Sequence, residues 1–333
     1  MKKGIEITLT ILAVVLVVAC ALFFAPAFTP DREPAGFSLP KADIIYQALN
    51  NQLDAPGGGI AESNNLIGFV NADGTGNTLV KLKYRAYQPV FSLEAGGVFF
   101  HNNESNPYLL VPQGGQTYFL SKSGTYEICT QLYAEGFVFR VEGTGYLLVS
   151  DGGDIELANM KTCKVIKRLV EIPNPGGLGG LVDSAYPSSS GKIVVFSESS
   201  FAPRHDMIYI MDIGTGVIQE VLQGGYNASF SPNDQRIAYV GDAGIYVANA
   251  DGTRNKLIVR IDFSSYSESA DIYADSVETP YPFWSSDGTA LVYHKCNNED
   301  CQDLSDFSIY KVDVNSGVEQ KIVDGGLYPV WIK

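Results

Sequence analysis

The side chains that most often perform acid–base and nucleophilic chemistry are sparse in this sequence. It contains only three histidines, His101, His205 and His294. It has no Gly-x-Ser-x-Gly motif, so a serine hydrolase would lack the turn that exposes its nucleophile. A glycine-rich run at residues 176–180 follows two prolines and precedes no helical pattern, which indicates a loop rather than a phosphate-binding turn. The sequence therefore predicts no catalytic residue and no cofactor.

Acidic side chains gather in two predicted loops, at residues 263–279 and 296–306. The acids of the first loop, which has no basic residue, are Glu268, Asp271, Asp275 and Glu278. Carboxylates in loops can bind Ca²⁺, but neither loop has the ligand spacing of an EF-hand. We interpret both as solvated acidic loops and predict no metal site.

The net charge excludes one broad class of function. The chain has 333 residues, with 23 Lys and Arg against 37 Asp and Glu, and a formal net charge of −14. A protein that binds the phosphate backbone needs clustered lysines and arginines, so we expect no nucleic acid partner. Hydrophobic residues make up 45% of the chain, which allows a large core and excludes a disordered or collagen-like protein.

The N-terminus has the pattern of a membrane anchor. Lys2 and Lys3 precede Ile7–Phe28, an uncharged apolar run that is long enough to cross a bilayer. The lysines are expected to stay in the cytoplasm, which places the rest of the chain outside it. We therefore predict a signal anchor and transmembrane helix at residues 1–28. The remainder is expected to be a periplasmic or extracellular part of a single-pass protein of the cell membrane.

Two cleavage routes remain as alternatives to the retained anchor. Val17–Cys20 resembles a bacterial lipobox, which would make Cys20 a lipidated N-terminus. Residues 25–27, Ala-Pro-Ala, fit the A-x-A pattern of a signal-peptide cleavage site. The apolar residues that follow Cys20 favour the uncleaved anchor, and all three routes export the rest of the chain.

Four cysteines follow the anchor: Cys129, Cys163, Cys296 and Cys301. Cysteines of an exported protein can form disulfides, and Cys296 with Cys301 would close a short loop. Cys129 and Cys163 are then left as the second candidate pair. The spacing of the four does not match a zinc site.

The segment between the anchor and the predicted strands, residues 29–56, is assigned to a stalk and a short helix. Three prolines between residues 30 and 40 predict an extended stalk. Lys41–Leu53 has apolar residues at a helical period, so we expect a short helix there. The Pro-Gly-Gly-Gly run that begins at Pro56 is expected to end it.

From residue 57 to residue 333 the sequence repeats a pair of hairpins. An aromatic residue is followed, seven positions later, by the start of an apolar strand. These pairs are Phe91 and Val98, Phe139 and Tyr146, Tyr186 and Ile193, Phe230 and Ile237, and Trp284 and Leu291. A second hairpin follows in each unit, most clearly at the Asn-Ala-Asp-Gly-Thr turns of residues 71–75 and 249–253. Each unit therefore has four strands, which we label a to d in chain order.

These units predict an all-β fold, a six-bladed β-propeller whose blades each have four strands. The b strands recur roughly every 40–50 residues, which is typical of propeller blades. A b strand expected at Ile60 has no a strand before it, and an a strand expected at Tyr328–Trp331 has no b strand after it. We therefore expect strands from the two ends of the chain to complete one blade and close the ring. The repeated aromatic residues are expected to pack in the core between blades.

Two of these units resemble the repeat of TolB-type propellers. The matching segments are Ser229–Thr253 and Pro282–Tyr293. The resemblance implies a six-bladed extracytoplasmic propeller that acts as a protein-interaction module. The chain departs from TolB itself, which has an α/β domain before its propeller, so the partners of TolB are not carried over. The same repeat occurs in prolyl-oligopeptidase-like peptidases, but we expect no hydrolase domain because the chain ends on a blade strand.

Propeller geometry selects one face as the candidate binding surface. The b–c and d–a connections share one face, the short a–b and c–d turns share the other, and nearly all the long connections are of the first kind. Long loops on a rigid scaffold commonly carry binding residues. The candidate partner-binding residues in these loops are Phe201, Arg204, His205, Tyr266, Glu268, Asp271, Tyr273 and Asp275. We expect this acidic, aromatic face to bind a basic protein surface or another component of the cell envelope.

Two classes of function are compatible with this face. The favoured one is a non-catalytic binding module, for which a wide and decorated face is sufficient. The alternative is a carbohydrate-active or other propeller enzyme that uses loop carboxylates, which would require two carboxylates to converge near the central channel.

Overall fold

The computed structural model describes residues 35, 37–48, 66–84, 86–92, 95–102, 115–134, 137–151, 154–171, 181–199, 206–263, 279–297 and 306–332. The chain divides into two units, Met1–Arg32 and Glu33–Lys333, and all the described residues belong to the second. The predicted anchor and Cys20 therefore lie outside the described residues. The described part of the chain contains no helix whose length and hydrophobicity would carry it across a bilayer.

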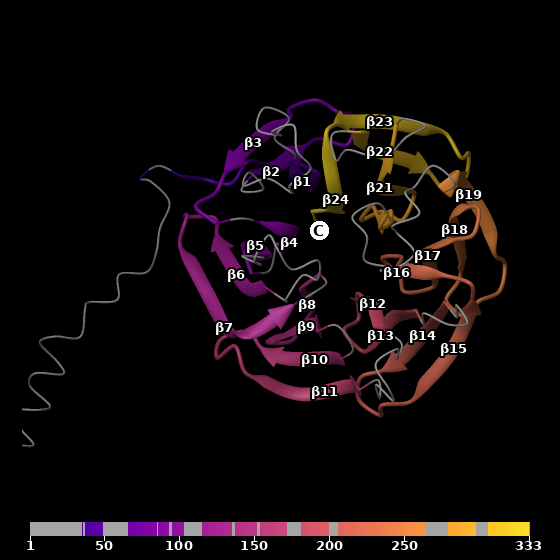
Figure 1. Cartoon of the computed structure of the whole chain (residues 1–333), viewed down its shortest axis with the longest axis horizontal. Helices are drawn as coiled ribbons and strands as arrows, with labels where there is room; N and C mark the ends of the chain where they lie inside the picture. Colours follow the sequence, from indigo (N-terminus) through magenta and orange to yellow (C-terminus); the bar gives the residue numbers. More distant parts are fainter. Residues whose placement is uncertain are drawn as a thin grey trace, which may run out of the picture. The chain divides into compact units, whose positions relative to one another are not determined.

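The unit Glu33–Lys333 is a six-bladed β-propeller in which each blade is a four-stranded antiparallel sheet, as the repeat predicts (Figure 1). In Figure 1 the a strands lie nearest the centre and the d strands at the periphery. From the inside outward, blade 1 consists of β24 (Gly326–Trp331), β1 (Ile44–Ala48), β2 (Leu66–Val70) and β3 (Thr78–Lys81). Blade 2 consists of β4 (Tyr87–Ser92), β5 (Gly97–Asn102), β6 (Gly115–Ser121) and β7 (Tyr126–Ala134). Blade 3 consists of β8 (Phe139–Val141), β9 (Tyr146–Asp151), β10 (Asp154–Asn159) and β11 (Val165–Glu171).

Blades 4 to 6 follow the same plan. Blade 4 consists of β12 (Leu181–Pro187), β13 (Ile193–Ser199), β14 (Met207–Asp212) and β15 (Ile218–Gln223). Blade 5 consists of β16 (Tyr226–Phe230), β17 (Arg236–Gly241), β18 (Gly244–Asn249) and β19 (Lys256–Arg260). Blade 6 consists of β20 (Phe283–Trp284), β21 (Ala290–Cys296), β22 (Phe307–Asp313) and β23 (Glu319–Asp324).

Strands from the two ends of this unit pair in blade 1 and close the ring, as predicted. The N-terminal strand of that pair is not the one that we predicted. The a strand β24 pairs with β1, with Ile44 opposite Trp331 and Ile45 opposite Val330. The segment that begins at Ile60, which we predicted as this b strand, lies outside the described residues. The b strand of blade 1 is therefore Ile44–Ala48.

The predicted short helix at Lys41–Leu53 is wrong, because its first half forms β1. All five residues of β1 are buried, since the strand lies between β24 and β2 in the sheet and is covered on both faces. A short apolar run buried on all sides shows no strand alternation and can be mistaken for a helix, although two adjacent isoleucines and a tyrosine favour a strand. The propeller thus includes part of the range 29–56 that we assigned to the stalk and helix.

The repeated aromatic residues occupy the a strands, as predicted. Phe91 lies opposite Val98, Phe230 opposite Ile237 and Trp284 opposite Leu291 across the a–b pairs of their blades. Each is buried, and Trp284 belongs to a core cluster shared by strands of blades 5 and 6. The sequence periodicity therefore located the innermost hairpins of these blades.

Contacts between neighbouring blades add polar interactions to this apolar packing. Between blades 5 and 6, the indole N–H of Trp284 donates a hydrogen bond to the carbonyl of Ser229 at 3.2 Å. The guanidinium carbon of Arg236 lies 4.5 Å from the centre of the Trp284 ring, and its Nη2 donates to the Gly288 carbonyl at 2.7 Å. Between blades 6 and 1, Lys311 Nζ donates to the Ala72 carbonyl at 2.6 Å.

The Asp-Gly turns predicted from the repeat form the c–d hairpins. In blade 1 the Asp73 carboxylate accepts hydrogen bonds from the backbone N–H and the hydroxyl of Thr75, at 2.9 and 2.6 Å. Asp251 and Thr253 form the same arrangement in blade 5. These hydrogen bonds favour the ionised carboxylates and lower the pKa of both aspartates.

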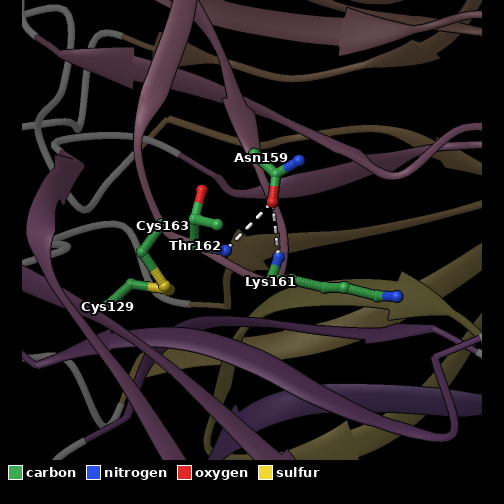
Figure 2. The surroundings of a disulfide bond; sticks show 5 residues. All are labelled: Cys129, Asn159, Lys161, Thr162 and Cys163. Atoms are coloured by element: carbon green, nitrogen blue, oxygen red, sulfur yellow. Dashed lines mark hydrogen bonds between the residues drawn. A yellow bond between two sulfur atoms is a disulfide. The ribbon is translucent and has the colours of Figure 1, made fainter.

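A disulfide between Cys129 and Cys163 links blades 2 and 3, as predicted (Figure 2). Cys129 lies in β7, the outer strand of blade 2, and Cys163 lies in the c–d turn of blade 3, with their Cα atoms 5.2 Å apart. The Asn159 side chain holds this turn by accepting hydrogen bonds from the N–H groups of Lys161 and Thr162. Cys296 is also disulfide-bonded, and its predicted partner Cys301 lies outside the described residues.

Replacing Cys129 and Cys163 together by alanine is expected to lower the free energy of unfolding. The bond joins residues separated by 34 positions, for which the chain-entropy model gives roughly 3–4 kcal/mol. Denaturant unfolding of the variant and the native protein at pH 7 measures the difference. Equal midpoints and slopes for the two proteins would show that the bond does not contribute to stability.

Candidate functional site

The candidate partner-binding residues predicted from the sequence all lie outside the described residues. They belong to two connections, the b–c connection between β13 and β14 and the d–a connection between β19 and β20. The structure therefore does not bring these residues together or separate them. It does fix the strand ends from which both connections start.

The long connections of the propeller leave one face of the ring. Because the strands of a blade are antiparallel and consecutive, its b–c and d–a connections are on the same face. The long segments of this kind are residues 49–65, 103–114, 172–180, 200–206, 261–282 and 297–306. The a–b and c–d turns on the opposite face are short, for example residues 188–192 and 213–217. We call these surfaces the long-loop face and the short-turn face.

The centre of the ring is filled by aromatic rings. Phe137 contacts Tyr281, Phe283 and Tyr328 with ring centroids 5.1, 5.1 and 5.9 Å apart, which joins blades 3, 6 and 1. Phe139 lies 4.6 Å from Tyr186 of blade 4 in an edge-to-face arrangement. All are 2–6% exposed. We call these six residues the aromatic plug, because their rings pack together from four different blades.

One small cavity lies beside the aromatic plug, next to strands of blades 4 and 5. A cavity of about 10 Å³ lies among residues that include Ser184, Asn227 and Tyr281, and it is large enough for about one water molecule. The amide of Asn227 donates to the Pro280 carbonyl at 3.2 Å. Its buried oxygen has no hydrogen-bond partner among the described residues. This cavity therefore fits a structural water rather than a ligand.

A larger cavity of about 270 Å³ lies where the a strands of blades 1 to 4 end. Phe139 and Tyr186 belong to the plug and also line this cavity. The residues that line it are Val90, Phe91, Ser92, Phe139, Arg140, Glu142, Tyr186, Pro187, Ser188, Ser189, Val330 and Trp331. Since the a–b turns begin here, the cavity is on the short-turn face, and we call it the short-turn pocket.

The polar groups of the short-turn pocket are held by the surrounding turns. Arg140 Nη2 donates to the carbonyl of Thr144 at 3.3 Å, and Glu142 is exposed beside it in the same turn. The hydroxyl of Ser189 donates to the carbonyl of Pro232 in blade 5 at 2.7 Å, and its N–H donates to Asp234. The described lining residues therefore combine aromatic walls with one guanidinium, one carboxylate and several hydroxyls, the usual composition of a small-ligand site.

His101 and His294 occupy equivalent places in the b strands of blades 2 and 6. Both are buried, and the described residues contain no group of three or more His, Cys, Asp or Glu that could hold a metal ion. His294 Nδ1 accepts a hydrogen bond from the N–H of Tyr328 at 3.3 Å, so it supports the closing strand. His205 lies outside the described residues.

His101 is expected to make the propeller sensitive to mild acid. Burial lowers the pKa of His101 to about 4, from about 6.5 in an unfolded chain. The stabilisation by its neutral form is complete above pH 6.5 and is lost as the pH falls toward 4. By linkage, the free energy of unfolding should fall by about 2 kcal/mol from this group between pH 7 and 5. Denaturant unfolding of the native protein and of His101→Gln at both pH values measures it, and an identical pH dependence would contradict the assignment.

The aromatic repeat that predicted the blades also contained the signal for the short-turn pocket. Phe91, Phe139 and Tyr186 are members of the repeat, and Trp331 belongs to the a strand predicted to close the ring. We interpreted such residues as packing between blades. The structure shows that these four pack in the core, as predicted, and also converge on one cavity, whereas Phe230 and Trp284 do not line it. Their convergence depends on which blades face each other across the axis, which the repeat alone does not show.

No protein-family model and no curated protein sequence matches the chain. Solved structures do share its fold. TolB from Acinetobacter baumannii superimposes with a TM-score of 0.64 at 15% sequence identity, over 87% of this chain and 66% of that one. The chain thus spans just under two thirds of the length of that TolB.

Two further structures show the range of proteins with this fold. A chain of the nidogen/laminin complex gives a TM-score of 0.58 at 12% identity, over 87% of this chain and 98% of that one. A gluconolactonase from Xanthomonas campestris gives 0.53 at 12% identity, over 89% of each chain. The chain therefore has a TolB-like six-bladed propeller fold. Because this architecture includes an enzyme as well as TolB, the fold does not select between binding and catalysis.

Proposed function

We propose that this protein is a membrane-anchored propeller that binds a protein or another component of the cell envelope outside the cytoplasm, without catalysing a reaction. The binding surface is the long-loop face, and the residues that contact the partner include Tyr266, Tyr273 and the acids between them. The N-terminal segment, residues 1–28, holds the propeller at the membrane.

The observation that carries this proposal is the asymmetry between the two faces of the ring. The connections at residues 261–282 and 297–306 are far longer than a turn between neighbouring strands requires, and both start from strand ends on the long-loop face. They start from strands held in a closed ring, so these loops are presented on a rigid support.

The charge of these connections indicates the kind of partner. The connection between β19 and β20 contains four acids at positions 264–278 and no basic residue. A dense group of carboxylates attracts a basic surface and repels an acidic one, so electrostatic complementarity selects the partner and accelerates its association. Aromatic side chains among the acids would supply the apolar anchors that dominate binding energy at interfaces.

The proposal is tested by capturing partners from intact membranes with a loop variant. The variant carries Tyr266→Ala, Tyr273→Ala, Glu268→Gln, Asp271→Asn, Asp275→Asn and Glu278→Gln. The control carries Val217→Ser and Val318→Ser, which replace side chains that are 66% and 67% exposed on the short-turn rim. We expect the loop variant to lose cross-linked partners without a change in melting temperature. Capture that survives in the loop variant but is lost in the control would place binding on the opposite face.

The location of the propeller is tested separately. Protease added to intact spheroplasts is expected to digest the propeller or release it, because the orientation set by Lys2 and Lys3 exposes it on the outer side of the cytoplasmic membrane. Lysed spheroplasts are the control for protease sensitivity. A propeller that is protected in intact cells and digested after lysis would contradict the proposed location.

A further inference from the structure

The geometry of the short-turn pocket points to a second binding site, on the face opposite to the one in the proposed function and independent of it. We propose that this pocket binds a neutral polyhydroxylated ligand of about the size of one sugar ring. The pocket has aromatic walls, a buried donor on one wall residue and two opposite charges at its mouth.

The walls favour a ligand with apolar faces. The rings of Phe91, Phe139, Tyr186 and Trp331 come from four different blades and line one cavity of about 270 Å³. This volume is at the lower end of the range for small-molecule pockets. A sugar ring exposes C–H groups on its faces, which pack against aromatic rings, and hydroxyls around its edge.

One buried donor of a wall residue has no acceptor among the described residues. The side chain of Trp331 is 8% exposed, and its indole N–H has no hydrogen-bond partner among the described residues. The other tryptophan of the chain, Trp284, donates its indole N–H to the Ser229 carbonyl. Most buried indole N–H groups are satisfied in this way, so a small movement of the Trp331 ring toward the cavity would let a ligand hydroxyl satisfy its N–H.

The charges at the mouth favour a neutral ligand over an ion. Arg140 offers only donors and Glu142, when ionised, only acceptors. A hydroxyl can accept from the guanidinium or from the indole, and it can donate to the carboxylate. A carboxylate ligand would be repelled by Glu142 and by a chain of net charge −14, and an ammonium ligand would be repelled by Arg140. A polyol can hydrogen-bond to both charged side chains at once.

The site is held in place before a ligand binds. Arg140 is tied to Thr144 within its own turn, and Ser189 is tied to Pro232 and Asp234 of the next blade. Groups that are already oriented lose little conformational freedom on binding, which favours recognition of a small ligand.

The two tryptophans make the proposal directly testable by NMR. The full-length chain, labelled with ¹⁵N and held in a detergent without a sugar headgroup, gives two indole N–H resonances, since it contains two tryptophans. Methyl glucopyranoside, methyl galactopyranoside and methyl mannopyranoside are titrated separately into the millimolar range. We expect at least one to shift the Trp331 resonance while that of Trp284 stays in place. Trp331→Phe assigns the two signals.

Variants at the mouth test the role of the charges. Arg140→Ala and Glu142→Ala are each expected to weaken binding of that glycoside by roughly tenfold or more, since each removes a hydrogen bond to a charged group. Lys164→Ala, at an exposed lysine of the rim, is the matched control and is expected to bind as the native protein does. Melting temperatures show that the variants are folded.

A tetrasaccharide of the sugar that binds distinguishes two sources of the ligand. Tighter binding than that of the monosaccharide supports recognition of a polymer end, and equal affinity supports recognition of a free sugar. No shift of Trp331 with any glycoside would overturn the proposal. It would also be overturned if benzoate shifted Trp331 and the glycosides did not, or if both mouth variants bound the glycoside with unchanged affinity.

Discussion

Removal of Tyr328–Lys333 is expected to abolish the cooperative unfolding of the propeller. This deletion takes away most of β24, the a strand of blade 1, and exposes the edge of β1. It also removes Tyr328, Val330 and Trp331, which are 2%, 4% and 8% exposed. Deletion of a single buried aromatic side chain typically costs about 3–5 kcal/mol, so loss of two together with a strand should exceed the stability of most domains.

Calorimetry of the truncated and the native chain measures this effect. Removal of Lys333 alone is the matched control and is expected to leave the transition unchanged. We expect the longer truncation to aggregate or to melt without a cooperative transition. A cooperative transition at the native temperature would mean that β24 does not close the ring.

Replacement of Gly68 by valine is expected to destabilise the propeller strongly, although it adds only a small apolar side chain. Gly68 lies opposite Tyr46 in the pairing of β1 and β2, and the Tyr46 ring covers it. A Cβ atom on Gly68 would lie 2.0 Å from Cζ of Tyr46, far inside van der Waals contact. Tyr46 is 1% exposed, and its hydroxyl donates to Asn77 at 2.7 Å, so the ring has little room to move. We expect a loss of about 3 kcal/mol or more in the free energy of unfolding.

The control is a glycine with open space around it. Gly145 has no heavy atom within 4 Å of an added Cβ, so Gly145→Ala is expected to change stability by less than about 0.5 kcal/mol. A double-mutant cycle identifies the cause of the effect at Gly68, because Gly68→Val should cost much less when Tyr46 is already alanine. An equal cost in both backgrounds would show that the clash with Tyr46 is not the reason.

The parts of the fold that could be predicted from the sequence are those set by local rules. The Asp-Gly turns at residues 73–74 and 251–252 specify tight hairpins by themselves, and the aromatic positions Phe91, Phe230 and Trp284 mark the a strands beside them. Repetition of this local pattern was sufficient to predict six blades and closure by the C-terminal strand.

The b strand of blade 1 could not be predicted in the same way. Ile44–Ala48 forms no hairpin with a neighbour close in sequence on its inner side, because its partner β24 lies at the other end of the chain. Without that partner, five buried residues fit a helical period as well as a strand. The sequence therefore favoured a later segment, at Ile60, which follows a glycine-rich turn.

The candidate sites differ in how far the sequence could reveal them. The long-loop face follows from connection lengths, which are readable without a structure, but the conformation of such connections is not set by a repeat. The short-turn pocket depends on contacts across the ring, where Phe139 of blade 3 and Trp331 of blade 1 line one cavity. Neither residue differs in type from those that only pack between blades, so only the three-dimensional arrangement reveals their common site.

The most direct test of the proposed function is photo-cross-linking at one residue on each face in living cells. A photoreactive phenylalanine analogue replaces Tyr266 on the long-loop face or Val318 on the short-turn rim in the full-length chain. If the long-loop face binds the partner, the analogue at position 266 gives a discrete cross-linked species and the analogue at position 318 gives none. The species from position 266 is lost when the four acids of that loop are replaced by their amides. The same species from both positions, or a species from position 318 alone, would contradict the proposed function.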